Sequence, residues 1–390
     1  MDVSIVGASE TEFGNLDKTY RDLISEAGHK AIKDADVDKD EIDSLYFGSY
    51  SPERFVHQGH TAALASLSLG MKHVPTTRIE NACSSGGAAF KEAYLAVASG
   101  EYDLALVLGA EKMTDVGTGE ATEILSMAGD DEHEGGLGMT FPGLFALMAQ
   151  AYKQEYGFSS SDFREILSSI SRKNHLNGFY NEKAHFNTKM SVEDANNSKM
   201  IASPLRLADC SPITDGAAAL VLAPSDKAEE YSEEPISIEG FGHATDLLSI
   251  HLREDLSKSK ATSQAAEESY NMASVKPQEI DFAELHDCFT INEILALEGL
   301  GFFSPGEAAE ASKKGKTGMS GDIPINPSGG LKAKGHPVGA TGIGQIVECV
   351  KQFRGEAEKE RQVESPNLGL THNIGGPAVS CFVNIFSKGW

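Results

Sequence analysis

The sequence predicts an α/β protein built from two similar halves. The chain has 390 residues, which is enough for two or three domains. Short apolar strands that end in glycine alternate with amphipathic helical segments, and this alternation is typical of α/β architecture. A pattern from the first 50 residues also recurs after residue 236.

The first half contains three predicted strands that end at a glycine, and two predicted helices lie between them. The strands are residues 4–7, 44–48 and 104–109, and the helices are residues 20–35 and 86–99. A further buried strand covers residues 217–223, and Pro224 closes it.

The second half repeats part of this pattern. Residues 237–240 resemble residues 4–7, and residues 275–281 match residues 37–43 at four of seven positions. A glycine-rich stretch before a helix follows in both halves, so the shared order favours an internal duplication. The join falls in the acidic stretch 225–235, which divides the chain into domains 1–230 and 231–390.

One long segment has no counterpart in the second half. Residues 113–205 carry the Gly-, Met- and Asn-rich stretches 135–143 and 174–197. An insertion of this size is more often a lid or a binding subdomain than a passive loop.

Composition excludes several classes of protein. The chain has 33 basic and 58 acidic residues, a formal net charge of −25, which argues against nucleic-acid binding and against an anionic membrane surface. No apolar run approaches the roughly 18–20 residues that span a bilayer, and the first residues lack a signal-peptide pattern. We therefore expect a cytoplasmic protein.

The cysteines exclude a disulfide framework and a structural zinc site. Their number is odd, and at least 32 positions separate neighbours, so no Cys-x-x-Cys pair is present. The five are Cys83, Cys210, Cys288, Cys349 and Cys381. Most free thiols of this kind are small buried hydrophobes, but one or two can be nucleophiles.

The first candidate motif is Asn-Ala-Cys-Ser-Ser-Gly-Gly, residues 81–87, which leads into an amphipathic helix. Cys83 then lies at the positive end of the helix dipole, which favours the thiolate and nucleophilic attack. The alternative is a buried cysteine beside a tight helix start.

The second motif is the glycine-rich stretch 326–342, which contains Gly-His-Pro at residues 335–337. It matches neither dinucleotide-binding nor Walker sequences. His336 on this constrained loop can act as a general base, and Lys332 and Lys334 supply positive charge for a phosphorylated ligand. The alternative is a glycine-rich turn with a surface histidine.

Two further motifs lie at strand ends. His-Asp-Cys-Phe, residues 286–289, follows the predicted strand 280–285, where chemistry in α/β proteins usually lies. His286 can donate to an oxyanion, and Cys288 is a second thiol. Residues 371–377 lead into a strand at 378–385, and their glycines can present backbone N–H groups to an anion.

At these four places the sequence resembles the thiolase family. Cys83 stands where the family has its acyl-accepting cysteine, and residues 335–337 match its Gly-His-Pro motif. Residues 286–289 resemble the variant of archaeal and sterol-carrier-protein-type thiolases. The resemblance implies a thiolase fold, in which two βαβαβαββ halves form an αβαβα arrangement of layers, with helices separating two sheets, and residues 113–205 form the inserted loop domain.

The resemblance also implies roles for individual residues. Backbone N–H groups of Cys83 and Gly375 would hold the tetrahedral oxyanion, and His286 and His336 would polarise the second carbonyl. Many thiolases have a second acid/base cysteine in the last motif, which this sequence lacks. Cys288 is the preferred substitute, His372 is the alternative, and Cys381 is expected in the core.

Coenzyme A contacts follow from archaeal-type members of the family. They imply a contact loop at Cys210, Ser211 and Ile213, and a phosphate contact from an exposed Lys332. For Cys210, a buried structural thiol is nearly as good an interpretation as a main-chain contact.

The implied reaction is reversible Claisen condensation of two acetyl-CoA to acetoacetyl-CoA and CoA, with no metal or redox cofactor. The resemblance also implies that the chain forms a homodimer or homotetramer. The other implied partners are HMG-CoA synthase of mevalonate synthesis and a small OB-fold zinc-ribbon protein. The alternatives are a degradative 3-ketoacyl-CoA thiolase, a β-ketoacyl synthase, and a non-catalytic acyl-CoA-binding or scaffolding homologue.

Overall fold

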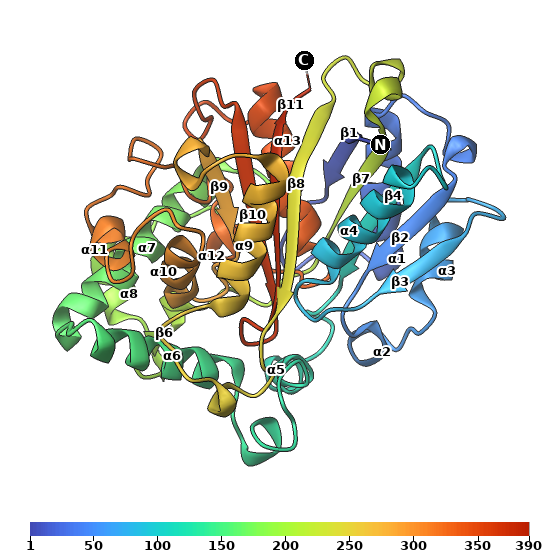
Figure 1. The fold of residues 1–390 in the computed structure, drawn as a ribbon. Helices are drawn as coiled ribbons and strands as arrows, with labels where there is room; N and C mark the ends of the chain where they lie inside the picture. Colours follow the sequence, from blue (N-terminus) through green and yellow to red (C-terminus); the bar gives the residue numbers. More distant parts are fainter. Residues whose placement is uncertain (390) are drawn as a thin grey trace.

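The computed structural model describes residues 1–389, and within them nine strands form one mixed sheet in the order β3-β2-β4-β7-β1-β8-β11-β10-β9 (Figure 1). Strand β1 (Val3–Glu10) meets β8 (Ile236–Thr245) at the centre, where Ser4 pairs with Ser237 and Ile5 with Ile236. The two expected sheets are therefore joined by a short antiparallel contact. This pairing of β1 with β8 satisfies backbone N–H and C=O groups that would stay unpaired if each strand were the edge of a separate sheet.

The first half follows the sequence prediction closely, and the predicted helix 20–35 begins where expected because Thr19 caps it. Strand β3 was not predicted, since it is four residues long, and most of its side chains are only half-buried. The elements are β1, α1 (Tyr20–Asp34), β2 (Ser44–Gly48), α2 (Pro52–Phe55), α3 (Thr61–Ser68), β3 (Thr76–Ile79), α4 (Ser85–Ala98), β4 (Ala105–Glu111) and β7 (Gly216–Pro224).

The second half repeats the strand order of the first. The order β2-β4-β7-β1 corresponds to β9-β10-β11-β8, and Ile325 makes a single bridge to β9 in the place that β3 takes beside β2. The elements are β8, α9 (Lys260–Ala273), β9 (Phe282–Leu285), α10 (Thr290–Gly299), α11 (Ala308–Lys313), α12 (Gly330–Ala333), α13 (Thr341–Arg354), β10 (Leu368–Gly375) and β11 (Ser380–Lys388).

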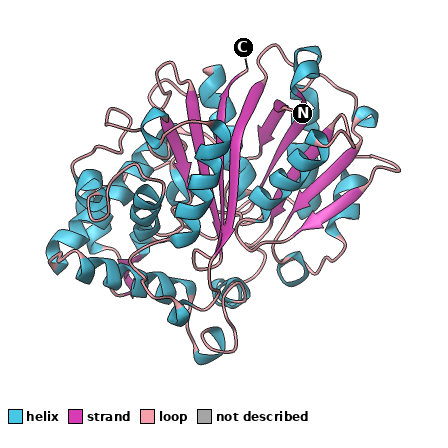
Figure 2. Ribbon diagram, in the orientation of Figure 1, coloured by secondary structure: helices cyan, strands magenta, loops and turns pink. Residues whose placement is uncertain are grey.

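Helices cover both faces of the strands (Figure 2), and α4 and α13 form a middle layer that contacts strands of both halves. Along β7, the side chains alternate between two cores: Leu220 and Leu222 pack with α4 and α13, whereas Val221 packs with α1. Helices α4 and α13 lie against each other in the middle layer, and α9 covers the outer face of β8 and β11. This middle layer carries Cys83 and His336 at the starts of its two helices.

The inserted segment forms a helical region that packs on the second half. Helix α7 contacts α10, α11 and α12, and α6 shares a core cluster with α10. Its elements are α5 (Thr118–Ser126), α6 (Phe141–Glu155), α7 (Ser160–Tyr180), α8 (Val192–Asn197), β5 (Met200–Ala202) and β6 (Leu205–Arg206). Within residues 1–389, no helix has the length and hydrophobicity needed to cross a bilayer.

A buried charge cluster joins β1 to the loop that carries His336. The fully buried Glu10 carboxylate lies 2.7 Å from the Lys334 Nζ and 2.5 Å from the Lys351 Nζ. These ammonium groups outweigh the cost of burial and hold the pKa of Glu10 below its usual range. The ionised carboxylate therefore stabilises the fold at neutral pH, and this contribution is lost as the pH falls through the folded pKa.

Glu10→Gln is expected to lower the free energy of unfolding by about 2–3 kcal/mol, because it removes the carboxylate that pairs the buried Lys334 and the partly buried Lys351. Urea unfolding at neutral pH measures this. A loss below about 1 kcal/mol would show that water already solvates Lys334 and Lys351.

Candidate active site

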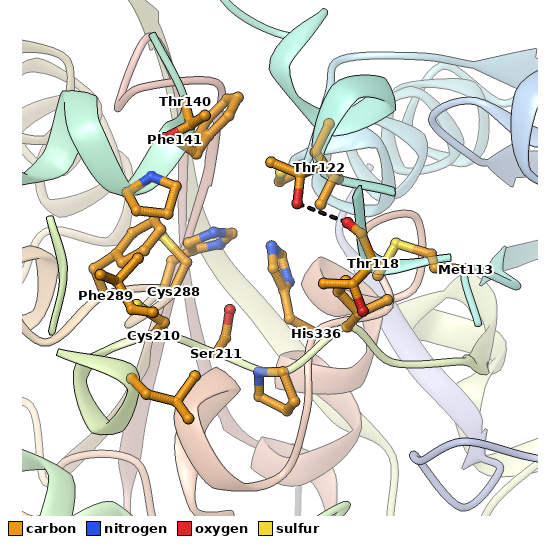
Figure 3. A pocket seen from close by; sticks show the side chains of 18 of the residues that line it. Met113, Thr118, Thr122, Thr140, Phe141, Cys210, Ser211, Cys288, Phe289 and His336 are labelled. Atoms are coloured by element: carbon orange, nitrogen blue, oxygen red, sulfur yellow. Dashed lines mark hydrogen bonds between the residues drawn. The ribbon is translucent and has the colours of Figure 1, made fainter. Parts of the chain in front are cut away.

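The four sequence motifs converge on one cavity of about 560 Å³ between the inserted region and the strand ends of the second half (Figure 3). Cys83, His286, Cys288 and His336 all line it. Apolar side chains complete the walls: Leu125 of α5, Phe141 of α6, Ile201 of β5, Leu207 after β6, and Phe289 just before α10.

Cys83 lies immediately before α4, after a left-handed residue, Ala82, with a φ of 49°. The backbone N–H of Gly376 and the N–H of Cys83 itself approach the sulfur. Burial and the nearby Glu111 carboxylate nevertheless raise the pKa of the Cys83 thiol to about 12. The helix dipole at the start of α4 contributes only about 1 kcal/mol toward the thiolate, and desolvation of the sulfur opposes it. Cys83 needs a base.

His336 lines the same cavity and has the tautomer of a base. Its Nδ1 lies 2.7 Å from the Thr341 Oγ1, and the Thr341 hydroxyl donates to the Pro337 carbonyl at 3.0 Å. Since that hydroxyl has one proton, it accepts from Nδ1–H, and the His336 Nε2 keeps its lone pair. Burial lowers the pKa of His336 to about 3, so the imidazole is neutral.

His286 has the opposite tautomer. The side-chain amide of Asn373 donates to its Nδ1 at 3.0 Å, and the backbone N–H of Ile374 does so at 3.3 Å. Nδ1 is therefore an acceptor, and Nε2 carries the proton. Burial lowers the pKa of His286 well below its usual value. The two rings lie edge to face, with centroids 4.9 Å apart, so the site combines one proton acceptor with one neutral donor.

The two candidates for the second acid/base lie in different places. Cys288 lines the cavity together with Cys83. His372 is fully buried outside it: its Nδ1 accepts the backbone N–H of His286 at 3.4 Å, and its Nε2 lies 3.0 Å from the Thr262 Oγ1. His372 therefore binds the His286 backbone from a position outside the cavity. Cys381 is buried in β11, as expected.

The expected coenzyme A loop lies on the cavity. Cys210, Ser211 and Ile213 all line it, and the Ser211 N–H donates to the Cys288 carbonyl at 2.9 Å. The Cys210 thiol itself donates to the Arg206 carbonyl at 3.4 Å, so its sulfur has a structural partner.

Lys332 departs from its expected position. It is 2% exposed, is not among the cavity residues, and its ammonium lies 5.6 Å from the centre of the Phe186 ring. The expectation that Lys332 is exposed is wrong, and its contact with a phosphate stays a prediction. Its spacing from His336 matched the family, but α12 turns the side chain into the protein, where burial lowers its pKa.

Gly375 ends β10 and lines a second cavity with Tyr50 and Asn81, whereas Gly376 lines both that cavity and the cavity of Cys83. The N–H that approaches the sulfur belongs to Gly376. Gly376 is therefore a candidate oxyanion donor beside Gly375, whose expected role stays a prediction.

The residues that fix the two tautomers were not predicted from the sequence. Asn373 holds His286 and also donates to the Cys83 carbonyl at 3.2 Å, and Thr341 holds His336. Asn373 lies in the motif 371–377, but its direction follows only once that stretch is known to be strand β10. Within residues 1–389, no group of three or more His, Cys, Asp or Glu is placed to hold a metal ion.

Alkylation tests the protonation state of Cys83. In His336→Ala, the rate constant for iodoacetamide at Cys83 should rise about tenfold per pH unit from about pH 7 to about pH 10, because its thiol pKa lies above that range. Peptide mass spectrometry separates Cys83 from Cys210 and Cys288, which line the same cavity. A plateau below about pH 8 would instead show that the helix start lowers the pKa of the thiol.

Family models and curated relatives match nearly the whole chain. Residues 3–226 match the family model described as thiolase, N-terminal domain, and residues 242–388 match the thiolase C-terminal domain-like model. An acetyl-CoA acetyltransferase of Methanothermobacter thermautotrophicus is 47% identical over 99% of this chain and 100% of its own length. One of Methanocaldococcus jannaschii is 44% identical over 99% of both chains, and bovine sterol carrier protein 2 is 32% identical over 100% of this chain and 72% of its own.

Solved structures share the fold. The Ltp2-ChsH2(DUF35) aldolase superposes with a TM-score of 0.84 at 23% identity, covering 100% of this chain and 98% of that one. An acetyl-CoA acetyltransferase from Syntrophomonas wolfei gives a TM-score of 0.74 at 18% identity and covers 99% of both chains. The expected α/β thiolase fold is confirmed. The chain belongs to the thiolase family of acyltransferases.

Proposed function

We propose that this chain is an acetyl-CoA C-acetyltransferase, which condenses two acetyl-CoA to acetoacetyl-CoA and CoA through an acetyl-Cys83 intermediate. The observation that carries the proposal is the cavity that Cys83 and Cys288 share with two imidazoles of opposite tautomer. The 44–47% identity to proteins named acetyl-CoA acetyltransferase supports the acetyl substrate.

The first half-reaction acetylates Cys83. The His336 Nε2 takes the thiol proton, and the thiolate attacks the thioester carbonyl. The N–H groups of Gly376 and Cys83 that approach the sulfur can hold the resulting oxyanion. The C–S bond to CoA then breaks, and His336 returns the proton to the departing CoA thiolate.

The second half-reaction forms the carbon–carbon bond. His336 takes the proton of Cys288, and this thiolate removes an α-proton from the second acetyl-CoA. The His286 Nε2–H and the imidazolium of His336 stabilise the enolate oxygen. The enolate attacks acetyl-Cys83, the Cys83 thiolate leaves, and His336 reprotonates it. Every transfer uses side chains, so the cycle needs no metal or redox cofactor.

The loop 210–213 is the proposed path of the pantetheine arm. Ser211 supplies a hydroxyl on the cavity wall, and Pro212 and Ile213 supply apolar contact. Cys210 would contribute its main chain, because its thiol already donates to Arg206.

We place this reaction in the cytoplasm, in the direction that supplies acetoacetyl-CoA to HMG-CoA synthase and mevalonate synthesis, and we propose a homodimer or homotetramer. The name of the Ltp2-ChsH2(DUF35) aldolase includes a DUF35 component, which supports a small partner protein. We propose that this partner is of the OB-fold zinc-ribbon type. Co-purification of a tagged chain from its native cells tests the partner and HMG-CoA synthase together.

Steady-state thiolysis separates this function from a degradative thiolase. We expect kcat/KM for acetoacetyl-CoA to exceed that for 3-ketohexanoyl-CoA and longer substrates by about tenfold or more, which a difference of about 1.4 kcal/mol in transition-state binding produces. An equal or higher value for the longer substrates would favour the degradative reaction. No turnover of any of them would favour a binding or scaffolding role.

A further inference from the structure

Four glycines mark the place where the helix of the nucleophile meets the loop of the base. A Cβ on Gly109 would lie 2.3 Å from the Gly339 carbonyl oxygen, and one on Gly86 would lie 2.9 Å from the same atom. A Cβ on Gly339 would lie 2.8 Å from the Gly48 carbonyl oxygen. The chain just after His336 therefore runs in backbone contact with the ends of β2 and β4 and the start of α4.

The carboxylate of Glu111 links the backbone segments that meet at these glycines. Glu111 is the last residue of β4 and is fully buried. Its Oε2 accepts the backbone N–H of Tyr50 at 2.8 Å and that of Gly339 at 3.1 Å, and its Oε1 accepts the N–H of Ser51 at 3.3 Å. One side chain thus binds the segment after β2 and the loop that carries His336.

The segment at residues 49–51 is fixed from its other side as well. Arg78 donates from Nε to the Ser49 carbonyl at 3.3 Å and from Nη2 to the Tyr50 carbonyl at 2.8 Å. Because both its N–H and its C=O groups are bound, this segment is a rigid support. Because Glu111 also accepts the N–H of Gly339, three residues after His336, it holds the His336 loop against this rigid segment.

We propose that Glu111 is a positioning residue, which fixes the His336 loop at the distance from Cys83 that proton transfer requires. The inference rests on the proposed acyl transfer. A displacement of about 1 Å between such groups costs about 100-fold in rate. Glu111 does not reach the substrate cavity, whose walls are formed by other residues.

The charge of Glu111 has a second consequence, which separates positioning from a purely structural role. The carboxylate is one of the groups that raise the pKa of the Cys83 thiol; Glu80 is another. Burial raises the pKa of Glu111 itself to about 7, against the N–H donors, Ser49 and Arg78. Removing the charge should therefore make Cys83 easier to alkylate while it makes acyl transfer slower.

The test compares Glu111→Gln with Glu111→Asp and with Glu80→Gln as a matched control. Glu80 lies near Cys83, but its carboxylate accepts the N–H of Ala82 at 2.6 Å and makes no contact with Gly339. For Glu111→Gln near pH 8 we expect kcat for thiolysis to fall about 30-fold with KM within about twofold. Alkylation of Cys83 should become about threefold faster or more.

Glu111→Asp keeps the charge but shortens the side chain, so we expect lower kcat and unchanged alkylation. Glu80→Gln should keep kcat within about threefold. The proposal would be overturned if Glu111→Gln kept the wild-type kcat. It would also be overturned if both Glu111 variants lost kcat, Tm and alkylation rate to the same extent. Alkylation needs no turnover. If the wild-type chain transfers no acyl group, the proposed function fails, whereas the alkylation rates still test the effect of the Glu111 charge on Cys83.

Discussion

Cys83→Ala is expected to abolish both condensation and thiolysis, with losses on the order of 10⁴-fold or more. The reason is that both directions pass through the same thioester at the sulfur, and Ala supplies no nucleophile. Steady-state assays in both directions measure the loss. Circular dichroism and urea unfolding provide the control, because Cys83 is only half-buried and its truncation should leave the fold intact.

Retention of even a tenth of wild-type thiolysis would remove Cys83 from the mechanism. Cys210→Ala is the matched control, since its sulfur lines the same cavity but donates to Arg206. We expect that variant to keep its rates within about tenfold.

Cys288→Ala is expected to separate the two half-reactions. Acetylation of Cys83 from acetyl-CoA should survive, because that step uses Cys83 and His336. Condensation should fail by on the order of 10³-fold or more, since no base remains for the α-proton of the second acetyl-CoA. The measurement is the acetyl-enzyme by mass spectrometry beside the rate of acetoacetyl-CoA formation.

His372→Ala should be milder, at about tenfold or less, because His372 contacts the His286 backbone and Thr262 but not the cavity. If His372→Ala blocked condensation while Cys288→Ala did not, the two roles would be reversed. The reaction would then use an imidazole where most thiolases use a thiol.

The elements that the sequence predicted well are those with a local signal. The strand 44–48 coincides with β2, and the predicted helices 20–35 and 86–99 agree with α1 and α4 to within a residue. Strand β10 was missed because Thr371, His372 and Asn373 are polar yet fully buried, and they are buried because they serve the site. Hydrophobic periodicity carries no signal for such a strand.

The candidate site was predictable as a set of residues but not as a set of roles. The motifs identified Cys83, His286, Cys288 and His336, and all four line one cavity. Which imidazole accepts and which donates depends on Thr341 and Asn373, which act across space. Spacing likewise gave no account of burial, which raises the pKa of the Cys83 thiol and leaves Lys332 inside the protein.

The proposed reaction requires the acyl group to pass through Cys83. The most direct measurement mixes the wild-type enzyme with acetyl-CoA, quenches it within one turnover, and maps acetyl groups on its peptides. We predict an acetyl thioester on the peptide that contains Cys83, formed with one CoA released per acetyl group and lost on addition of free CoA. Release of acetoacetyl-CoA without a detectable acetyl group at Cys83, or an acetyl group at Cys210 or Cys288 instead, would contradict it.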